Sequence, residues 1–207
     1  MRRIFADLVG GLVLSGDLPG DVTAFLAQNG YQNSINHSRQ VAEIGRQLAL
    51  RFGADPDKAA QAGWLHDVSV IFLDDQHIGI TRQLGLALLP EEEINPVLTH
   101  QKISVLMAQE IFGIQDIEIL GAIGCHTSLR AHATLLDKVL FVADKTAWDQ
   151  VGNPGYLEEI IAASAFSLDE AALVYIRYLY GRQSSLPGPL HPWLLEAFKD
   201  LSKPEVA

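Results

Sequence analysis

Apolar residues in this chain recur three or four positions apart, as in Val41, Ile44 and Leu48, which share one side of a helix. Strict alternation of apolar and polar residues, the mark of a half-buried strand, is absent, and clusters of β-branched residues are short. The pattern therefore predicts an all-α, single-domain helical bundle of about six to eight helices.

Caps and breakers set the predicted helix boundaries. Asp55-Pro56 and Asn95-Pro96 each place a capping residue before a proline that suits the first helical turn, while Gly53 and Gly113 end helices. Helices are predicted over residues 22–28, 36–52, 56–72, 96–111, 116–125, 135–148, 168–180 and 193–201. We expect residues 1–30 to form an N-terminal helical extension, 31–182 the main domain, and 183–207 a C-terminal loop and short helix packed on it.

Charge excludes one class of partner. The 207 residues include 25 acidic and 15 basic side chains, for a formal net charge of −10. Binding to a nucleic-acid backbone needs a surplus of Lys and Arg to displace counterions, so a nucleic-acid polymer is not an expected partner. A small phosphorylated ligand stays open, because bound metal ions can supply local positive charge.

The sequence predicts a cytoplasmic protein. No stretch reaches the roughly 18–20 apolar residues that a membrane span requires, so no membrane partner is expected. The start of the chain is basic, but Asp7 interrupts the apolar run that a signal peptide would need. Cys125 is the single cysteine, so no disulfide framework can form, which is typical of a reducing compartment.

Polar residues lie on helix faces that should be buried. His37, for example, precedes Val41 by four positions, and the pair His66-Asp67 ends a run of small and apolar residues. A buried polar group without a partner costs about 1–3 kcal/mol, and an unpaired carboxylate costs far more. Metal coordination would satisfy all of them, since imidazole and carboxylate suit Fe, Mn, Zn and Ni. The candidate metal ligands are His37, His66, Asp67, His100, His126 and Asp144.

Six ligands suit two metal ions held in the core of a helical bundle, with open positions left for water and substrate. Next to a helix end, the adjacent side chains of His66 and Asp67 can both reach one ion, although they diverge by about 100° on a regular helix. The second oxygen of Asp67 is then free to reach the other ion.

The order His37, His66-Asp67, Asp144 resembles the signature of the HD-domain metal-dependent phosphohydrolases. The flanking sequences agree: Asn36-His37-Ser38-Arg39-Gln40-Val41, Ala62-Gly63-Trp64-Leu65-His66-Asp67 and Phe141-Val142-Ala143-Asp144-Lys145. His100 and His126 resemble the YqeK-type branch, whose members are symmetrical dinucleoside tetraphosphatases with a two-metal, usually iron, centre. The resemblance covers roughly residues 30–180 and implies an HD-type helical bundle over 31–182.

Three positions depart from that branch. Val70 stands where a lysine is common, Leu129 replaces the glycine of the His-Thr-Ser-Gly-Arg motif, and Ala147-Trp148 occupy the place of a Glu-Pro pair. The six ligands are retained, whereas residues expected to touch phosphate or shape the pocket are not. The resemblance therefore implies a sister subgroup with its own substrate.

The resemblance also implies roles at the site. Asp67 would bridge two ions, most commonly iron, with Mn, Ni, Zn or Mg as alternatives, and an activated water would attack phosphorus in line. Arg130 would act with Asp67 in catalysis as a phosphate clamp, because guanidinium pairs bidentately with phosphate. Thr127, Lys102 and Lys145 are further candidates for substrate contacts. For each lysine the alternative is an ordinary solvated side chain, and Thr127 and Ser128 could instead serve a turn or cap.

The expected function is a metal-dependent phosphohydrolase that cleaves a nucleotide or related small phosphate ester or anhydride, a dinucleoside tetraphosphate among them. A non-catalytic nucleotide-binding regulator is the first alternative, favoured by Val70 and Leu129. An iron oxygenase on the same scaffold is the second alternative. The oligomeric state stays open, with a homodimer as one alternative.

The remaining polar and aromatic clusters are interpreted structurally. Glu91 to Glu93 read as a solvated helix start, where negative charge is favourable. Packing or surface positions are expected for Tyr175, Tyr178, Tyr180, His77, His132 and His191.

Overall fold

The computed structural model describes residues 1–148 and 152–203, which form twelve α-helices, four 3-10 helices and no strand. The α-helices are α1 (Arg3–Val9), α2 (Leu18–Gln28), α3 (Gln32–Phe52), α4 (Pro56–Leu65), α5 (His77–Gln83), α6 (Pro90–Ile94), α7 (His100–Glu110), α8 (Ile117–Cys125), α9 (Leu135–Thr146), α10 (Leu157–Ser164), α11 (Leu168–Gly181) and α12 (Pro192–Leu201). The 3-10 helices are η1 (Val68–Ile71), η2 (Asp74–Gln76), η3 (Pro96–Thr99) and η4 (Gln183–Ser185). The all-α prediction is confirmed.

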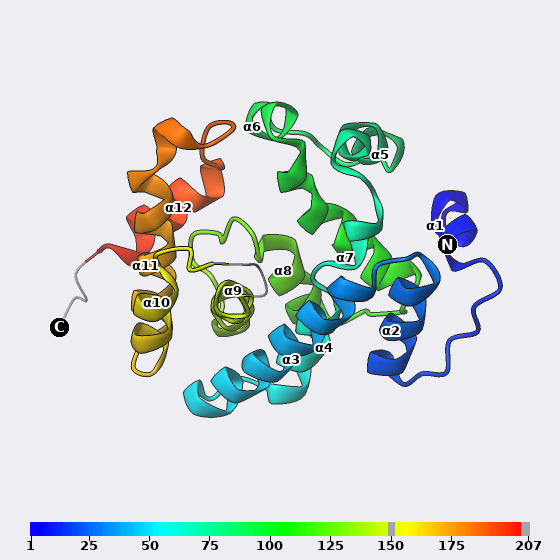
Figure 1. Cartoon of the computed structure of the whole chain (residues 1–207), viewed down its shortest axis with the longest axis horizontal. Helices are drawn as coiled ribbons and strands as arrows, with labels where there is room; N and C mark the ends of the chain where they lie inside the picture. The colour runs from blue at the N-terminus through cyan, green and yellow to red at the C-terminus, as the bar shows by residue number, and fades with distance from the viewer. Residues whose placement is uncertain (149–151, 204–207) are drawn as a thin grey trace.

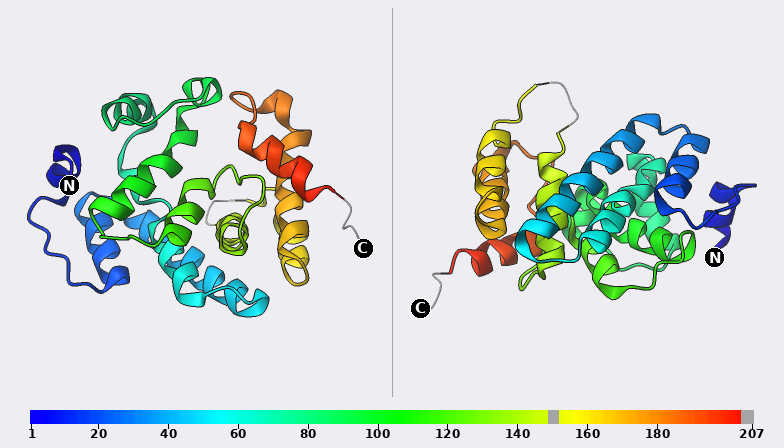
Figure 2. Two further views of the ribbon diagram at one scale, coloured as in Figure 1. Left: turned by 180° about the vertical axis from the view of Figure 1, so that it is seen from behind. Right: turned by 90° about the horizontal axis from the view of Figure 1, so that it is seen from below.

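Four helices form the centre of the molecule. Helix α3 packs along α4 and α9, and α8 lies against α4, α7 and α9 (Figure 1). Helices α10 and α11 pack on α9 and on each other, with α12 against α11, while α1 and α2 lie at the opposite end. Helices α1 and α12 are accordingly far apart in both further views (Figure 2). Fully buried apolar side chains fill the space between these helices, including Val41, Ile103, Ile123 and Leu140.

Small residues let α3 and α4 approach closely. Gly63 of α4 faces Ala42 of α3, and a Cβ atom on Gly63 would lie 2.5 Å from the Ala42 Cα and 2.6 Å from its nitrogen. Gly45 of α3 makes a second close approach, since its Cβ would lie 3.4 Å from the Ala59 carbonyl oxygen. These two helices carry His37 and His66, so the close contact sets how near those side chains come.

The predicted helix over 56–72 is wrong in extent. Helix α4 ends at Leu65, His66 is its C-cap, and Asp67 leaves helical geometry with φ −114° and ψ 22°. The chain then turns into the short helix η1. This break lets two adjacent side chains, His66 and Asp67, face the same side.

Other boundaries differ because no side-chain cap marks the start of helices α3, α5 and α10. Helix α3 begins at Gln32, four residues before the predicted start, and the short helices α5 and α10 were not predicted. Side-chain caps form at the predicted Asp55 and also at Asp116, Thr134, Ser167 and His191. The predicted cap at Asn95 is wrong, because its side chain makes no cap hydrogen bond and residues 96–99 form the 3-10 helix η3 before α7 begins at His100. None of the described helices is both long and apolar enough to cross a lipid bilayer.

Candidate metal centre

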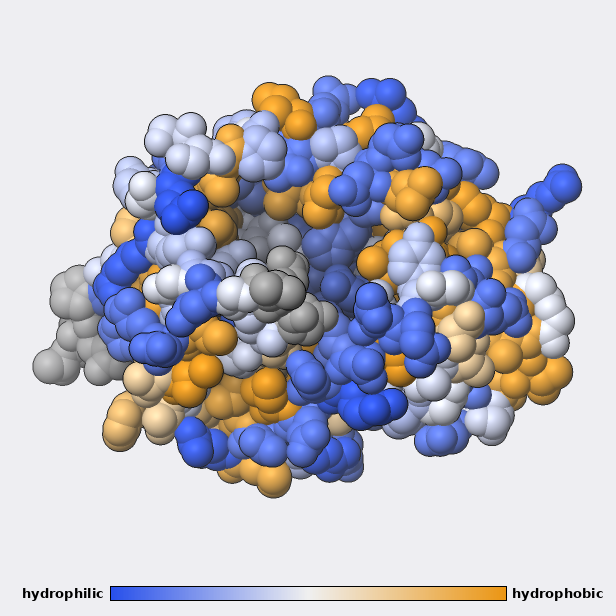
Figure 3. Space-filling view, in the orientation of Figure 1, coloured by the Kyte–Doolittle hydropathy of each residue, from blue (hydrophilic) through white to orange (hydrophobic). Residues whose placement is uncertain are grey.

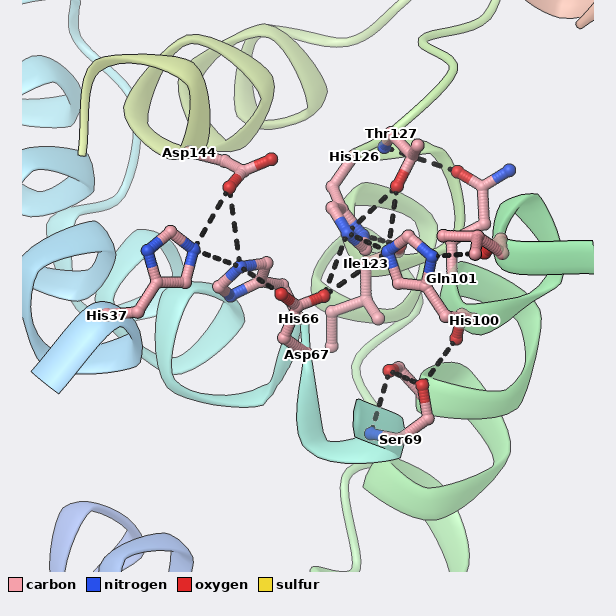
Figure 4. Close-up of polar contacts among 12 residues, drawn as sticks. His37, His66, Asp67, Ser69, His100, Gln101, Ile123, His126, Thr127 and Asp144 are labelled. Atoms are coloured by element: carbon pink, nitrogen blue, oxygen red, sulfur yellow. Dashed lines mark hydrogen bonds and ion pairs between the residues drawn. The ribbon is translucent and has the colours of Figure 1, made fainter. Parts of the chain in front are cut away.

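The six predicted ligands lie together where four central helices and α7 meet. Each stands in the early part or at the end of its helix, so its side chain reaches into one shared space (Figure 4). They are His37 in α3, His66 at the C-cap of α4, Asp67 directly after it, His100 at the start of α7, His126 at the C-cap of α8 and Asp144 near the end of α9.

Three of the histidines are oriented by the same local hydrogen bond. In each, Nδ1 lies against the carbonyl oxygen three residues earlier in the chain. A carbonyl oxygen can only accept a hydrogen bond, so Nδ1 carries the proton and Nε2 is left as a bare acceptor. The distances are 2.8 Å from His66 to Gly63, 2.6 Å from His100 to Val97 and 2.8 Å from His126 to Ile123.

The Nε2 atoms of four histidines converge in two pairs. The Nε2 atoms of His100 and His126 are 2.9 Å apart, and those of His37 and His66 are 3.3 Å apart. The Thr127 hydroxyl lies 2.9 Å from the first of these atoms and 3.0 Å from the second, and it can donate its one hydrogen to only one of them. The facing lone pairs of His100 and His126 would be stabilised by a cation between them.

Asp67 stands between two groups of donors. Its Oδ1 is 3.2 Å from His100 Nε2 and 3.3 Å from His126 Nε2, and its Oδ2 is 3.5 Å from His66 Nε2. One oxygen thus faces the pair His100 and His126, and the other faces His66. The donors of each group lie within 4.8 Å of one another, so Asp67 is shared by the triplets His37, His66, Asp67 and Asp67, His100, His126.

Asp144 completes the first group. Its Oδ1 lies 3.2 Å from His37 Nε2 and 3.6 Å from His66 Nε2. Imidazole nitrogens and carboxylate oxygens at this spacing fit two transition-metal ions, each with open positions. The donor set therefore fits the pair of metal ions that the sequence pattern implies.

The pKa values of Asp67, Asp144 and His126 favour metal binding. Burial alone would raise the pKa of Asp67 and Asp144, but neighbouring histidines, and Lys145 beside Asp144, outweigh it and hold both pKa values well below the usual range. Burial lowers the pKa of His126 to about 4. Both carboxylates are thus ionised and His126 is neutral near pH 7, and these are the protonation states that metal ligands require. Burial alone would lower the pKa of His66, but Asp67 and Asp144 outweigh it and raise that pKa, so a metal ion would compete with a proton there.

A cavity of about 340 Å³ opens beside the first group of donors. This face of the molecule is hollowed near its centre (Figure 3). His37, Asp67, Asp144 and Lys145 form its charged side. The other lining residues, none of which the sequence analysis assigned to the site, are Asn33, Ser34, Ala147, Trp148, Tyr156 and Tyr175.

A smaller cavity of about 140 Å³ adjoins the second group of donors. Asp67 and His100 reach it from the metal side, and Val70 and Phe72 form part of its wall. Val70 therefore presents an apolar side chain to this cavity, at the position where the resemblance to the YqeK-type branch implied a lysine.

Lys145 lies inside the main cavity and is not the solvated lysine that was considered as an alternative. Its side chain is only 11% exposed, its ammonium group pairs with Asp144, and its Nζ lies 5.3 Å from the centre of the Tyr175 ring. Burial alone would lower the pKa of Lys145, but Asp144 and Tyr175 outweigh it and raise the pKa above its usual value. The cavity therefore contains a fixed positive charge next to the ligands.

Arg130 does not line either cavity that adjoins the ligands. Its Nε and one terminal nitrogen lie 2.9 and 2.8 Å from the fully buried carboxylate of Asp137, in the first turn of α9. The preceding residue, Leu129, is buried and has φ +44°, a left-handed conformation that glycine adopts without strain. This conformation explains why glycine suits that position in the motif that the sequence resembles.

Lys102 and Glu92 form a buried pair away from the ligands. Lys102 Nζ lies 2.7 Å from the Glu92 carboxylate, which is fully buried and is also approached by His191 Nε2 at 3.4 Å. The interpretation of Glu91 to Glu93 as a solvated helix start is therefore wrong for Glu92. The pair links α6, α7 and the start of α12, and it indicates a structural role for Lys102.

Lys102→Met is expected to lower the free energy of unfolding by about 1–3 kcal/mol, because a buried carboxylate loses an ammonium partner. Burial alone would raise the pKa of Glu92, but His191, Lys102 and the Leu89 amide hold it below the usual value. The stabilisation is thus present at neutral pH and is lost as the pH falls through that lowered pKa. Urea denaturation of both proteins at pH 7 and at pH 4 measures the difference.

Lys203→Met is the matched control, because Lys203 pairs with Asp200 at the surface and its side chain is 66% exposed. Such an exposed pair contributes at most about 1 kcal/mol. Equal stability of the Lys102 and Lys203 variants at pH 7 would contradict the assignment.

Two of the remaining predicted side chains also have defined places. Thr127 lies beside the second group of donors, and its amide lies 3.3 Å from Gln101 Oε1. Ser128 is buried and accepts a hydrogen bond from Gln101 Nε2 at 3.1 Å, so its hydroxyl holds the loop rather than facing the main cavity.

A family model for the HD domain matches residues 34–149 of this chain. An uncharacterized protein from the pepC 5′ region of Lactococcus lactis subsp. cremoris is 40% identical over 144 residues, 70% of this chain and 72% of that protein. A symmetrical bis(5′-nucleosyl)-tetraphosphatase of Bacillus subtilis is 38% identical over 109 residues, 52% of this chain and 58% of the enzyme. The counterpart in Halalkalibacterium halodurans is 32% identical over 126 residues and is covered over 63% of its length.

A crystal structure from Clostridium acetobutylicum, described as a predicted HD superfamily hydrolase involved in NAD metabolism, has a similar fold. Its TM-score is 0.79 at 27% identity, with 88% of this chain and 95% of that chain covered. The HD model covers more than half of the residues, and the four residues of the HD signature lie in one centre with His100 and His126. The chain therefore belongs to the HD-domain family of metal-dependent phosphohydrolases.

Proposed function

We propose that this HD phosphohydrolase cleaves phosphoanhydride or phosphoester bonds of nucleotides, with a dinucleoside tetraphosphate as the first substrate to test. The observation that carries the proposal is the pair of ligand groups sharing Asp67, beside a cavity that contains the ammonium group of Lys145. The named activity of the Bacillus and Halalkalibacterium relatives supports a tetraphosphate substrate, although the chain spans only about three fifths of their length.

Two ions, with iron as the first choice and Mn, Ni, Zn or Mg as alternatives, would be held by His37, His66, Asp67 and Asp144 and by Asp67, His100 and His126. When bound, they would supply charge neutralisation on phosphoryl oxygens and a lowered pKa for a water molecule. The carbonyl contacts of the three Nδ1 atoms orient the imidazoles beforehand, so no reorientation is needed on binding.

The chain itself supplies the positioning of the substrate. Lys145 offers a fixed positive charge where a phosphate oxygen would lie, and the Thr127 hydroxyl lies at the edge of the second donor group. Arg130 was predicted as the phosphate clamp, but such a role would require its guanidinium to leave Asp137. We therefore assign the pairing with phosphate to Lys145.

Lys145→Met is expected to raise KM for a nucleotide about tenfold to a hundredfold, since a hydrogen bond to a charged group contributes about 1.5–3 kcal/mol. Lys138→Met serves as control, because Lys138 pairs with Asp169 and does not line the cavity. Steady-state kinetics with metal content measured on the same samples checks the result. An unchanged KM in the metal-loaded Lys145 variant would rule out the assigned role.

A substrate panel tests the proposal as a whole. Dinucleoside polyphosphates, deoxynucleotides, nucleoside monophosphates and cyclic dinucleotides would each be incubated with the metal-loaded protein. Turnover of one member at about 1 s⁻¹ or faster, the ordinary range for enzymes, would support the hydrolase. Tight binding without turnover of any member would favour the regulator instead, for which the absence of a lysine at Val70 is the supporting observation.

A further inference from the structure

The main cavity has two unlike sides. One side holds the metal ligands and Lys145, and the other is formed by the rings of Trp148, Tyr156 and Tyr175. Helix α9 ends just before Trp148, Tyr156 is the N-cap of α10, and Tyr175 belongs to α11. Three separate elements thus bring aromatic rings to one wall, which we call the aromatic wall.

The aromatic wall is fixed by contacts among its rings. Tyr156 packs edge to face against Trp148 at 6.4 Å and against Tyr175 at 4.9 Å, and Tyr178 supports it from behind at 4.9 Å. The Trp148 indole N–H donates to the Gly152 carbonyl at 2.7 Å, which sets the orientation of its ring. A wall held in this way loses little side-chain entropy when a flat ligand binds to it.

The wall is also uncharged near neutral pH. Burial raises the pKa of Tyr156 to about 12 and raises that of Tyr175, so neither phenol becomes an anion that would repel a phosphorylated ligand. Asn33 and Ser34, in the first turn of α3, supply polar side chains to the same cavity. Such groups can form hydrogen bonds with the edge of a heterocycle.

We propose that the aromatic wall, and Trp148 above all, binds the base of the nucleotide substrate while the phosphates lie toward Lys145 and the metal ligands. The inference rests on the proposed function and adds to it the site that recognises the base of the nucleotide. A volume of about 340 Å³ is at the small end of ligand sites, which fits one nucleoside rather than two. Tyr175 therefore has a role beyond the packing expected from the sequence.

Tryptophan fluorescence gives a readout independent of turnover. Addition of ADP to the metal-loaded protein is expected to quench the emission, because a base stacked on Trp148 contacts its ring directly. The quenching should be lost in Trp148→Phe and retained in Trp64→Phe, since Trp64 lines a separate groove with Arg39 and Arg46. Quenching that persists in Trp148→Phe would overturn the inference.

Kinetics with two kinds of substrate provides the second test. Trp148→Leu is expected to raise KM for a nucleotide about 5- to 100-fold, the range that one stacked base contributes, with kcat little changed. KM for inorganic tripolyphosphate, which has no base, should stay within about twofold of wild type. Trp148→Phe keeps a ring and should retain most of the affinity, which separates stacking from simple loss of volume.

The outcomes distinguish the two proposals. Turnover of nucleotide and tripolyphosphate with equal KM values, unchanged in Trp148→Leu, would reject the base site and leave the hydrolase standing. Quenching by ADP that depends on Trp148, with no turnover of any phosphate compound, would support the base site and reject the hydrolase.

Discussion

Asp67→Asn is expected to remove both metal ions and to lower phosphohydrolase turnover by at least about 10²–10³-fold, the effect of losing one charge-stabilising group from an active site. Asp67 is the ligand that the two groups share, with one oxygen toward His100 and His126 and the other toward His66. The amide keeps the shape of the side chain but loses its negative charge and one acceptor oxygen, so neither group retains its full set of donors.

Asp67→Asn needs a control that removes a negative charge from a nearby acidic residue outside the site. Asp75→Asn removes a charge from an exposed position eight residues later in the chain, outside the cavities that adjoin the ligands. Elemental analysis, initial rates and circular dichroism would be measured on both variants and on wild type. Asp67→Asn with wild-type turnover and metal content would contradict the bridging role, and an equal loss in Asp75→Asn would show that the effect is not specific.

Gly63→Ala is expected to destabilise the protein by about 3 kcal/mol or more and to weaken metal binding with it. The added Cβ would lie 2.5 Å from the Cα of Ala42, and overpacking of this kind forces the backbone to move. Because the clash is with backbone atoms, Ala42→Gly should not relieve it. The Gly63 carbonyl also accepts the hydrogen bond from His66 Nδ1, so separation of α3 and α4 would disturb the site.

Gly79→Ala is the matched control for this change. Gly79 lies in α5 with no atom within 4 Å of its added Cβ, so alanine should be neutral or stabilising there by up to about 1 kcal/mol. Chemical denaturation with and without a chelator separates the effect on folding from the effect on metal affinity. A Gly63 variant as stable as the Gly79 variant would mean that the two helices are not packed as described.

The candidate ligands could be predicted from the sequence because they are polar residues at positions that should be buried. His37, His100, His126 and Asp144 each stand on the apolar side of a helix, where a polar side chain needs a partner, and that position depends only on spacing along the chain. The pair His66-Asp67 was recognisable for a different reason, since its motif matches the HD signature. The observed fold brings all six together.

The rest of the site depends on contacts between helices, which spacing does not determine. Arg130 pairs with Asp137 seven residues later and lies outside the cavity, whereas Lys145, the weaker candidate for a substrate contact, turns toward Asp144 and Tyr175 inside it. The aromatic wall is assembled from three elements that share no sequence motif. The domain limits at residues 30 and 182 stay a prediction.

The count of metal ions per chain tests the central claim most directly. Protein purified without an affinity tag would be analysed as wild type, as His37→Ala and as His100→Ala, because these two histidines belong to different ligand groups. The account predicts two ions in wild type and one in each variant. A wild-type chain without bound metal, or two ions retained in both variants, would contradict it.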